Sequence, residues 1–215
     1  MKKAKRIARC RADVYVETNN AFLKSFSDVA VEFFPDLKVI HVIRNPLAVA
    51  RSQLNRHMWL NRMHFPLRRY YTGGDGEKYF KWTLTGKEDI FRAVATPGDA
   101  LTPYQYLVLQ WIEIENRAMK FLDKYQKHHE CYTLFAPQDL NNTRTLEDLF
   151  RFFGLEQKEP GICLCGRRNK NAIPTLVSEE DQRQFNGIIR RLPDSYLTIF
   201  QKKPYTECDW AKTLF

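Results

Sequence analysis

No stretch of this sequence is apolar for long enough to cross a lipid bilayer as a helix. A bilayer-spanning helix needs roughly 18 apolar residues, and no run in the chain approaches that length. The first residues, MKKAKRIARC, are basic but lack the apolar core of a secretory signal. We therefore expect no transmembrane segment.

The sequence also lacks cysteines at the spacing of a metal site. Its five cysteines form an odd set, in which Cys163 and Cys165 flank a single residue. This pair could chelate a metal only with further partners, and the nearest histidines, His128 and His129, lie far along the chain. We expect no structural metal, and free thiols in a reducing compartment, which favours a cytoplasmic location.

Low-complexity tracts and internal repeats are absent as well. Apolar residues make up 44% of the chain and aromatic residues 13%, which excludes the intrinsically disordered class. A chain of 215 residues can bury a sizeable core as one domain. We expect a single domain over residues 1–215, with a lid or acceptor-side insertion at about residues 64–101. The alternative for that insertion is a surface excursion packed on its own aromatic residues.

Acidic residues are outnumbered by basic ones. The chain has 34 Lys and Arg against 25 Asp and Glu, a net charge of +9 (34 minus 25). Such a charge attracts anionic partners before any specific contact forms, but it does not distinguish a nucleotide from nucleic acid, phospholipid or acidic polysaccharide. A basic nucleic-acid-binding protein is thus one alternative. We expect no nucleic-acid partner, because no recognised nucleic-acid-binding module is present.

The most informative segment is KVIHVIRNPLAVARSQLN, residues 38–55. It opens with a near-continuous apolar run, typical of a strand buried on both faces in a parallel sheet. Arg44 ends this run, Asn45 has the side chain of an N-cap residue, and Pro46 suits the first helical position, where a missing N–H costs nothing. The pattern predicts a strand that leads directly into a helix.

Polar groups at this junction suggest an anion site. Helix N-terminal amides carry a partial positive charge, and Arg44 adds a forked donor that matches phosphate. Ser52 and Asn55 fall off the apolar stripe of the helix, which we expect to face the sheet. That stripe consists of Leu47, Ala50, Leu54 and Met58. The alternative is that Arg44 pairs with a nearby carboxylate and Ser52 only faces solvent.

This segment resembles the PAPS-dependent sulfotransferase family. There, a strand ending in Arg-Asn-Pro or Arg-Asp-Pro leads to a helix that carries a Ser eight residues after the Arg, as Ser52 follows Arg44. The resemblance implies that Arg44 and Ser52 hold the 3′-phosphate of the donor, 3′-phosphoadenosine 5′-phosphosulfate (PAPS). It also implies a P-loop-NTPase-like α/β fold, an open parallel sheet flanked by helices.

The resemblance covers roughly residues 12–192. A long helix, the segment CYTLFAPQDL and a helix ending in FFGL follow in the order of bacterial-type sulfotransferases. The segment GRRNKNAIPTLVSEEDQ resembles the family's basic loop, which closes over the 3′-phosphate. The residues that this resemblance assigns to donor binding are Arg167, Arg168 and Lys170.

One part of the family pattern is missing. The family grips the 5′-phosphosulfate with a Gly-rich loop after its first strand, and no such segment is present. GGDGEK at 73–78 lacks the Lys-Ser/Thr ending of a P-loop, and TGKED at 85–89 lacks the upstream Gly. We interpret the chain as a family member shortened at its N-terminus. An inactive protein that retains only 3′-phosphate nucleotide binding is the alternative.

The general base is also in question. Where many family members have a Lys-Thr-His or Lys-x-Pro segment, this chain reads Glu17, Thr18, Asn19, Asn20. Glu17 would act as a base if it reached within ~3 Å of an acceptor hydroxyl, although such a carboxylate often caps the next helix instead. Glu17 is our candidate catalytic residue. The acceptor would be a hydroxyl or an amine, with carbohydrate among the possible classes.

The rest of the chain alternates strands and helices. We expect a strand at 13–17, a helix at about 20–34, and a third strand at 131–136. The first of these would form a βαβ unit with the Arg44 strand, so that Glu17 and Arg44 share one rim of the sheet. The segment QKKPYTECDW near the C-terminus reads as an irregular tail.

Three further helices carry start or stop signals. Thr102 and Gln105 form a capping box. Thr145, with Asp148, starts a helix that Gly154 would end in the left-handed conformation. The last long helix is expected to begin at Ser178 and to stop at Pro193.

Overall fold

The computed structural model describes residues 5, 7–10, 14–18, 22–62, 70–72, 78–80, 84, 86–156, 161–162, 164 and 176–215. Its strands are β1 (Val39–Ile43), β2 (Tyr70–Thr72), β3 (Lys78–Phe80) and β4 (Cys131–Phe135). Its α-helices are α2 (Ser27–Phe33), α3 (Pro46–Arg62), α4 (Asp89–Ala93), α5 (Pro103–Lys124), α6 (Thr143–Phe152), α7 (Glu179–Ile189), α8 (Asp194–Leu197) and α9 (Asp209–Leu214). A π-helical turn, η1 (Phe22–Phe26), and the 3-10 turns η2 (Asp139–Asn141), η3 (Thr198–Gln201) and η4 (Tyr205–Glu207) complete the elements.

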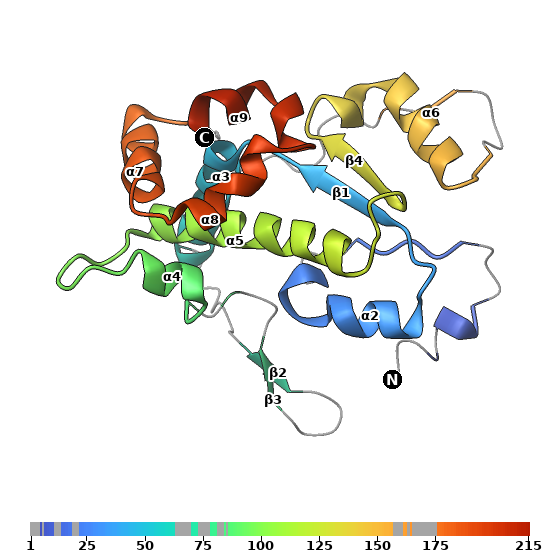
Figure 1. The fold of residues 1–215 in the computed structure, drawn as a ribbon, viewed down its shortest axis with the longest axis horizontal. Coiled ribbons are helices and arrows are strands. Elements are labelled where there is room, and N and C mark those ends of the chain that lie inside the picture. Colours follow the sequence, from blue (N-terminus) through green and yellow to red (C-terminus); the bar gives the residue numbers. More distant parts are fainter. Residues whose placement is uncertain are drawn as a thin grey trace.

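The chain has a mixed α/β fold that contains a parallel pair of strands (Figure 1). β1 and β4 run parallel with His41 opposite Thr133, and the ladder extends at both ends through Val39 N to Glu130 O and Ala136 N to Ile43 O, both 2.8 Å. β2 and β3 form a separate antiparallel pair. The strands predicted at 39–43 and 131–136 are therefore confirmed.

The strand predicted at 13–17 is not formed. Residues 14–18 have no strand pairing, and Val14, Tyr15 and Val16 are exposed. The Tyr15 hydroxyl instead donates a local hydrogen bond of 3.0 Å to Glu17 Oε2. A short run of β-branched and aromatic residues forms a strand only where its side chains are buried, and these side chains are not. The expected βαβ unit is consequently absent from the described part of the chain.

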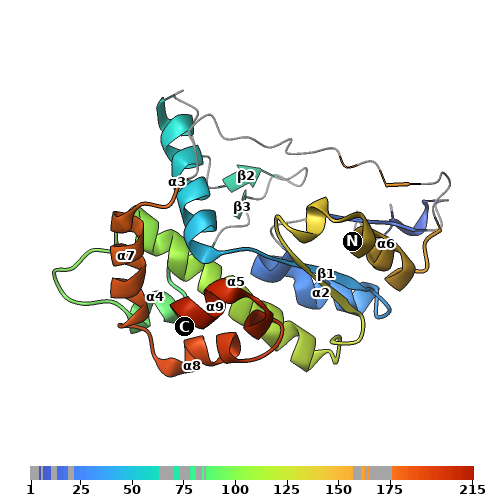
Figure 2. The same cartoon turned by 90° about the horizontal axis from the view of Figure 1, so that it is seen from above.

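β1 is not covered on both faces, contrary to expectation. His41 and Ile43 point toward the core, whereas Ile40 and Val42 remain 39% and 48% exposed. The helices gather around α5 instead of sandwiching the sheet (Figures 1 and 2). One face of β1 therefore lies open within the part of the chain that the structure describes.

Helix α5 is the centre of the fold. Its buried side chains include Leu107, Val108, Leu109 and Ile112, and α3, α4, α7, α8 and η1 all pack against it (Figure 2). Its start is the predicted capping box, in which Thr102 Oγ1 accepts from Gln105 N at 3.1 Å and Gln105 Oε1 accepts from Thr102 N at 3.1 Å. The apolar side chains of α5 therefore form the centre of the hydrophobic core.

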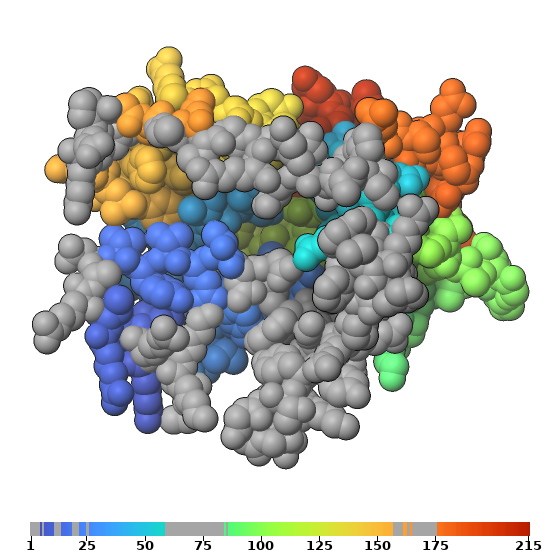
Figure 3. All heavy atoms as spheres, turned by 180° about the vertical axis from the view of Figure 1, so that it is seen from behind, coloured from blue at the N-terminus to red at the C-terminus, as the bar shows by residue number. Residues whose placement is uncertain are grey.

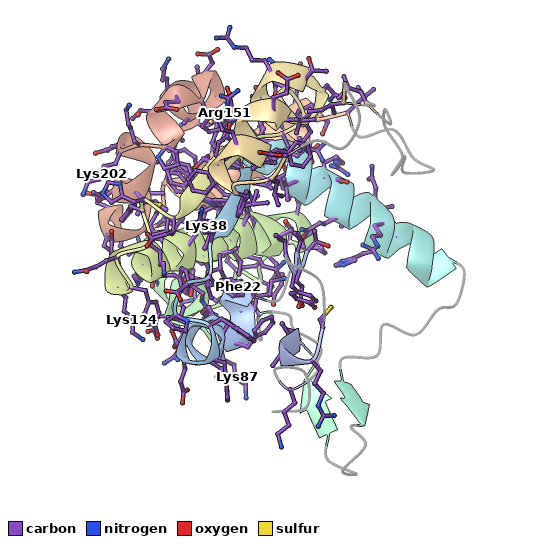
Figure 4. All side chains as sticks on the ribbon, turned by 90° about the vertical axis from the view of Figure 1, so that its right-hand side faces the viewer. Phe22, Lys38, Lys87, Lys124, Arg151 and Lys202 are labelled. Carbon is purple, nitrogen blue, oxygen red and sulfur yellow. The ribbon has the colours of Figure 1, made fainter. Side chains whose placement is uncertain are left out.

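The predicted helix at 20–34 forms in two parts, the π-turn η1 and then α2, which ends before Pro35. The Phe22 ring packs edge-on against Phe121 of α5 with ring centroids 5.3 Å apart, and Figure 4 labels this residue. Farther along α2, Val29 and Phe33 are exposed. The element is thus anchored mainly at its N-terminal end.

The C-terminal segment is ordered and buried, not an irregular tail. It folds into η3, η4 and α9, and places Phe200, Tyr205, Cys208 and Ala211 in the core. The Phe200 ring stacks on Trp111 at 5.4 Å and on Phe215 at 4.0 Å. The segment was predicted to be an irregular tail, but its aromatic side chains fill the space beside α5.

Of the two predicted ends of helix α6, the start was wrong and the end is confirmed. The N-cap of α6 is Asn142, not Thr145, because Asn142 Oδ1 accepts from Arg144 N at 3.0 Å and from Thr145 N at 3.3 Å. Gly154 does end this helix with a φ of 69°, as expected. Lys38 Nζ also donates to the last-turn carbonyl of Phe152 at 2.9 Å, which ties α6 to the start of β1 (Figure 4).

Within the described ranges, no helix has both the length and the apolar character needed to cross a membrane. The insertion at 64–101 contains β2, β3 and α4, but residues 63–69, 73–77, 81–83 and 85 lie outside the described residues. Its role as a lid or acceptor surface stays a prediction.

Candidate anion-binding site at the end of β1

Arg44 lies directly after β1, at the point where the chain turns into α3 (Figure 2). Its side chain is half-buried. No hydrogen bond or ion pair engages its guanidinium from any residue in the described ranges. The alternative interpretation, in which a nearby carboxylate neutralises Arg44, therefore finds no such carboxylate in this part of the chain.

Asn45 is the N-cap of α3, as predicted. Its Oδ1 accepts from Leu47 N at 3.0 Å and from Ala48 N at 3.4 Å, while its carbonyl accepts from Val49 N at 3.0 Å. Pro46 has no N–H to offer. The first-turn amides of α3 are thus already hydrogen-bonded to Asn45. Arg44 and the helix dipole remain as the sources of positive potential.

Ser52 lies on α3 and is half-buried. At a rise of about 1.5 Å per residue it stands about 9 Å along the helix axis from Pro46. Ser52 already has an interaction within the protein. Arg44 and Ser52 therefore belong to one strand-to-helix unit, β1 followed by α3. Atoms of α3 reach the surface of the molecule that Figure 3 shows.

The packing of α3 differs from the predicted stripe. The helix packs on α5 and α7, not on the sheet. Leu47 and Ala50 are buried as expected, whereas Met58 is exposed and Asn55 is buried. The apolar stripe was predicted for a flat sheet surface, and the crossing helices α5 and α7 cover a different strip of α3.

Arg51 of α3 forms a buried ion pair with Asp181 of α7. Its Nε donates to Asp181 Oδ2 at 2.8 Å and its Nη2 donates to Asp181 Oδ1, a two-pronged pair with a fully buried carboxylate. Burial raises the pKa of Asp181, but hydrogen bonds from Arg51 and Ser178 outweigh burial, so this pKa lies below its ordinary value. Sequence reasoning missed this pair, because Arg51 and Asp181 are far apart in the chain.

A second buried polar cluster lies beneath β1. Glu115 Oε2 accepts from the Tyr205 hydroxyl at 2.7 Å and from His41 Nε2 at 2.9 Å. Burial, the Glu115 charge and this hydrogen bond raise the pKa of Tyr205. The signal in the sequence was a Glu on the apolar face of α5, four residues after Trp111 and three before Ala118. The cluster links β1, α5 and η4 three residues before Arg44.

The cysteines do not form a site in the described residues. Burial raises the pKa of Cys131 and of Cys208 to about 11 each, so both stay protonated thiols at neutral pH, and Cys10 is exposed. Cys163 and Cys165 lie outside the described residues. No three His, Cys, Asp or Glu side chains gather at a metal-binding distance within the described ranges. The absence of a structural metal from the whole protein stays a prediction.

Glu17 does not share a sheet rim with Arg44. Its segment is unpaired with β1, its side chain is exposed, and its carboxylate accepts the hydrogen bond from Tyr15. The shared rim depended on the strand at 13–17, which is not formed. The role of Glu17 as a general base is therefore without support from its position.

The three basic-loop residues, Arg167, Arg168 and Lys170, lie outside the described residues. A hollow of about 220 Å³ lies elsewhere, between α4, α5 and α8. Its walls are polar, with acidic and basic side chains in equal number. They are Glu88, Asp89, Arg92, Glu113, Arg117, Lys120 and Tyr196.

The candidate site is thus a half-buried guanidinium at the carboxyl end of a parallel strand, beside a capped helix. Such an edge is where open α/β sheets bind ligands. Comparison with protein-family models, with curated proteins and with solved structures found no match to this chain.

Proposed function

We propose that this protein binds the 3′-phosphate of PAPS at Arg44 and Ser52, and transfers its sulfuryl group to a hydroxyl or amine acceptor. The observation that carries the proposal is Arg44, a half-buried cation at the carboxyl end of β1 that forms no ion pair with any residue in the described ranges. A planar guanidinium can bind a phosphate with two parallel hydrogen bonds. The order of Arg, N-cap, Pro and Ser is the order in the sulfotransferase family that the sequence resembles.

The local chemistry fits a side-chain site rather than a backbone site. Because Asn45 occupies the amides of Leu47 and Ala48, a phosphate here would be held by the guanidinium and by hydroxyl donors. The dipole of α3 adds a favourable term for negative charge near its N-terminus, worth about 0.3 to 1 kcal/mol. Arg44 therefore contributes more to phosphate binding than the helix dipole does in this proposal.

Transfer of the sulfuryl group would be an in-line displacement. The acceptor oxygen or nitrogen forms the new bond to sulfur while the bond to the 5′-phosphate oxygen breaks, and the acceptor proton passes to a base. As in phosphoryl transfer, the protein supplies positioning and charge stabilisation and forms no covalent bond itself. The donor is the sulfate-bearing nucleotide, and acidic carbohydrate is among the acceptor classes that the basic charge would favour.

A second function, nucleotide binding without transfer, is favoured by one observation. Glu17, the proposed base, lies on an exposed segment that is not paired with β1. Together with the missing Gly-rich loop in the sequence, this leaves the 5′-phosphosulfate side of the donor without assigned contacts. Such a protein would bind adenosine 3′,5′-bisphosphate and leave PAPS intact.

The binding part is tested by calorimetric titration with adenosine 3′,5′-bisphosphate. Arg44→Ala is expected to weaken binding roughly 10- to 100-fold, since it removes a charge-assisted hydrogen bond to phosphate. Arg56→Ala is the matched control, because Arg56 is an exposed arginine on α3. Equal affinities of wild type and Arg44→Ala would remove the site assignment.

The transfer part is tested with sulfur-labelled PAPS and a panel of hydroxyl and amine acceptors. Label in any acceptor, lost in Arg44→Ala and kept in Arg56→Ala, is the expected result for the enzyme. Nucleotide binding with no labelled acceptor and no loss of PAPS would establish the second function instead.

A further inference from the structure

The buried ion pair between Arg51 and Asp181 joins α3 to α7 immediately beside Ser52. Both oxygens of the Asp181 carboxylate accept from Arg51, and Oδ2 also accepts from Ser178 N at 2.9 Å. The Asp181 side chain is 0% exposed, whereas that of Arg51 is 22% exposed. A carboxylate so fully engaged has one allowed orientation, and it holds the guanidinium in one orientation too.

A third helix closes around the same pair. The Arg51 guanidinium lies 5.5 Å from the centre of the Tyr104 ring of α5, and the Tyr104 hydroxyl donates to Leu47 O of α3 at 3.3 Å. Asp181 also belongs to the capping box that starts α7, where Ser178 Oγ accepts from Asp181 N at 3.2 Å. One side-chain contact therefore connects α3, α5 and the first turn of α7.

This contact fixes the rotation of α3 about its own axis. Consecutive residues of an α-helix are separated by about 100° of rotation, so the direction of Arg51 sets the direction of Ser52. The hydrogen bonds of Asn45 hold the N-terminal end of the same helix, next to Arg44. Between them, these two anchors determine the direction in which the Ser52 side chain leaves α3, relative to Arg44.

We propose that Arg51 and Asp181 are positioning residues for the anion site, which they serve by locking the rotation of α3 and hence the orientation of Ser52. The inference rests on the proposed function, because it concerns the same 3′-phosphate site. Neither residue contacts the ligand in this scheme. Asp181 neutralises Arg51 and holds it toward α7, which leaves Arg44 as the cation for phosphate.

A buried ion pair is better suited to fixing the orientation of α3 than to raising the free energy of unfolding. Desolvating two charges costs free energy that their attraction only partly returns, so hydrophobic residues in the same place would often stabilise a protein as well or better. What the fork-to-carboxylate geometry adds is a defined direction. Loss of the geometry should therefore change ligand affinity in protein that remains folded.

The test compares Asp181→Asn and Arg51→Lys with wild type. Asp181→Asn removes the charge at nearly constant shape, and Arg51→Lys keeps the charge but loses the fork. The control is Arg183→Lys, which alters an exposed ion pair on the same helix, between Arg183 and Glu180. Urea unfolding first establishes that each variant is folded in the absence of urea. Calorimetric titration with adenosine 3′,5′-bisphosphate is then done in urea-free buffer.

The proposal expects about tenfold weaker binding by folded Asp181→Asn and Arg51→Lys, and wild-type binding by Arg183→Lys. A purely structural pair would lower the unfolding midpoint and leave the affinity of the folded protein unchanged, and that result would overturn the proposal. A wild type that does not bind the nucleotide would instead overturn the proposed function.

A measurement without ligand separates these two failures. Amide hydrogen exchange in Asp181→Asn is expected to be at least about tenfold faster in residues 49–54 of α3, with the exchange of β4 unchanged. If exchange in α3 stays at the wild-type rate, the pair does not lock the helix and the inference is wrong, whatever the nucleotide result.

Discussion

At the scale of single residues, Glu115 shows how one buried carboxylate can hold distant segments together. It accepts hydrogen bonds from His41 of β1 and from Tyr205 of η4 through the same oxygen, Oε2. His41 Nδ1, in contrast, is buried without a hydrogen-bond partner among the described residues. The carboxylate thus depends on its Tyr205 and His41 donors to offset the cost of its own burial.

Tyr205→Phe should therefore destabilise the protein by about 1.5 to 3 kcal/mol, because it removes a hydrogen bond to a buried charged group. Urea unfolding monitored by tryptophan fluorescence measures the change. Tyr196→Phe is the control, since the Tyr196 hydroxyl makes no hydrogen bond within the described ranges. Equal losses in the two variants would mean that the Tyr205 hydroxyl adds nothing to stability.

At the scale of elements, the N-termini of α3, α5 and α7 are each fixed by side-chain caps. In α7 the cap residue Asp181 has a second role as the partner of Arg51. Its pKa in the folded protein lies below its ordinary value, because the hydrogen bonds from Arg51 and Ser178 outweigh the effect of burial. This shift couples the docking of α7 on α3 to pH.

The sign of this coupling follows from the depressed pKa. The stabilisation is complete above the unfolded-state pKa of about 3.9, and it is lost as the pH falls through the lower folded-state value. Urea unfolding between pH 6 and pH 2 should show a steeper acid loss of stability for wild type than for Asp181→Asn. Parallel pH profiles for the two proteins would contradict the depressed pKa.

At the scale of the whole molecule, the last eighteen residues, 198–215, complete the core around α5. Phe200 is 2% exposed between Trp111 and Phe215, and Tyr205 is fully buried. In Figure 1 this segment lies over α3 and α5, with the C-terminus at the top of the molecule. The C-terminal segment is consequently part of the fold that carries β1 and Arg44.

Phe200→Ala should cost about 3 to 5 kcal/mol of unfolding free energy, the usual penalty for emptying a packed aromatic site. Phe33→Ala is the matched control, because Phe33 is 45% exposed. It should cost less than about 1 kcal/mol. A loss at Phe200 no larger than at Phe33 would show that the C-terminal segment is not part of the cooperative core.

The elements that sequence predicted well are those with local signals. The strand at 39–43, the cap at Asn45, the capping box at Thr102, the helix start at Ser178 and the left-handed Gly154 all depend on neighbouring residues. The incorrect or missed predictions concern tertiary packing. Whether residues 14–18 pair, whether Phe200 is buried, and which carboxylate meets Arg51 depend on packing between distant segments, which one sequence does not display.

The candidate site shows the same difference between residues with a local signal and residues placed by tertiary packing. Arg44, Asn45 and Ser52 were found from the motif, and the structure places all three on the β1–α3 unit. Arg51, Asp181 and Glu115 were not found, because each acts through a partner more than 70 residues away, as the separations of 130 and 74 residues show. The motif pointed to the residues of the proposed anion site, whereas the buried polar groups that join distant segments gave no local signal.

The central claim, that Arg44 binds a nucleotide 3′-phosphate, is tested most directly by a two-ligand comparison. Wild type and Arg44→Ala are each titrated with adenosine 3′,5′-bisphosphate and with adenosine 5′-monophosphate, which lacks only the 3′-phosphate. We expect wild type to prefer the bisphosphate by roughly 10- to 100-fold, and this preference to vanish in Arg44→Ala. A wild type that binds the two nucleotides equally, or a preference that survives in Arg44→Ala, would contradict the claim.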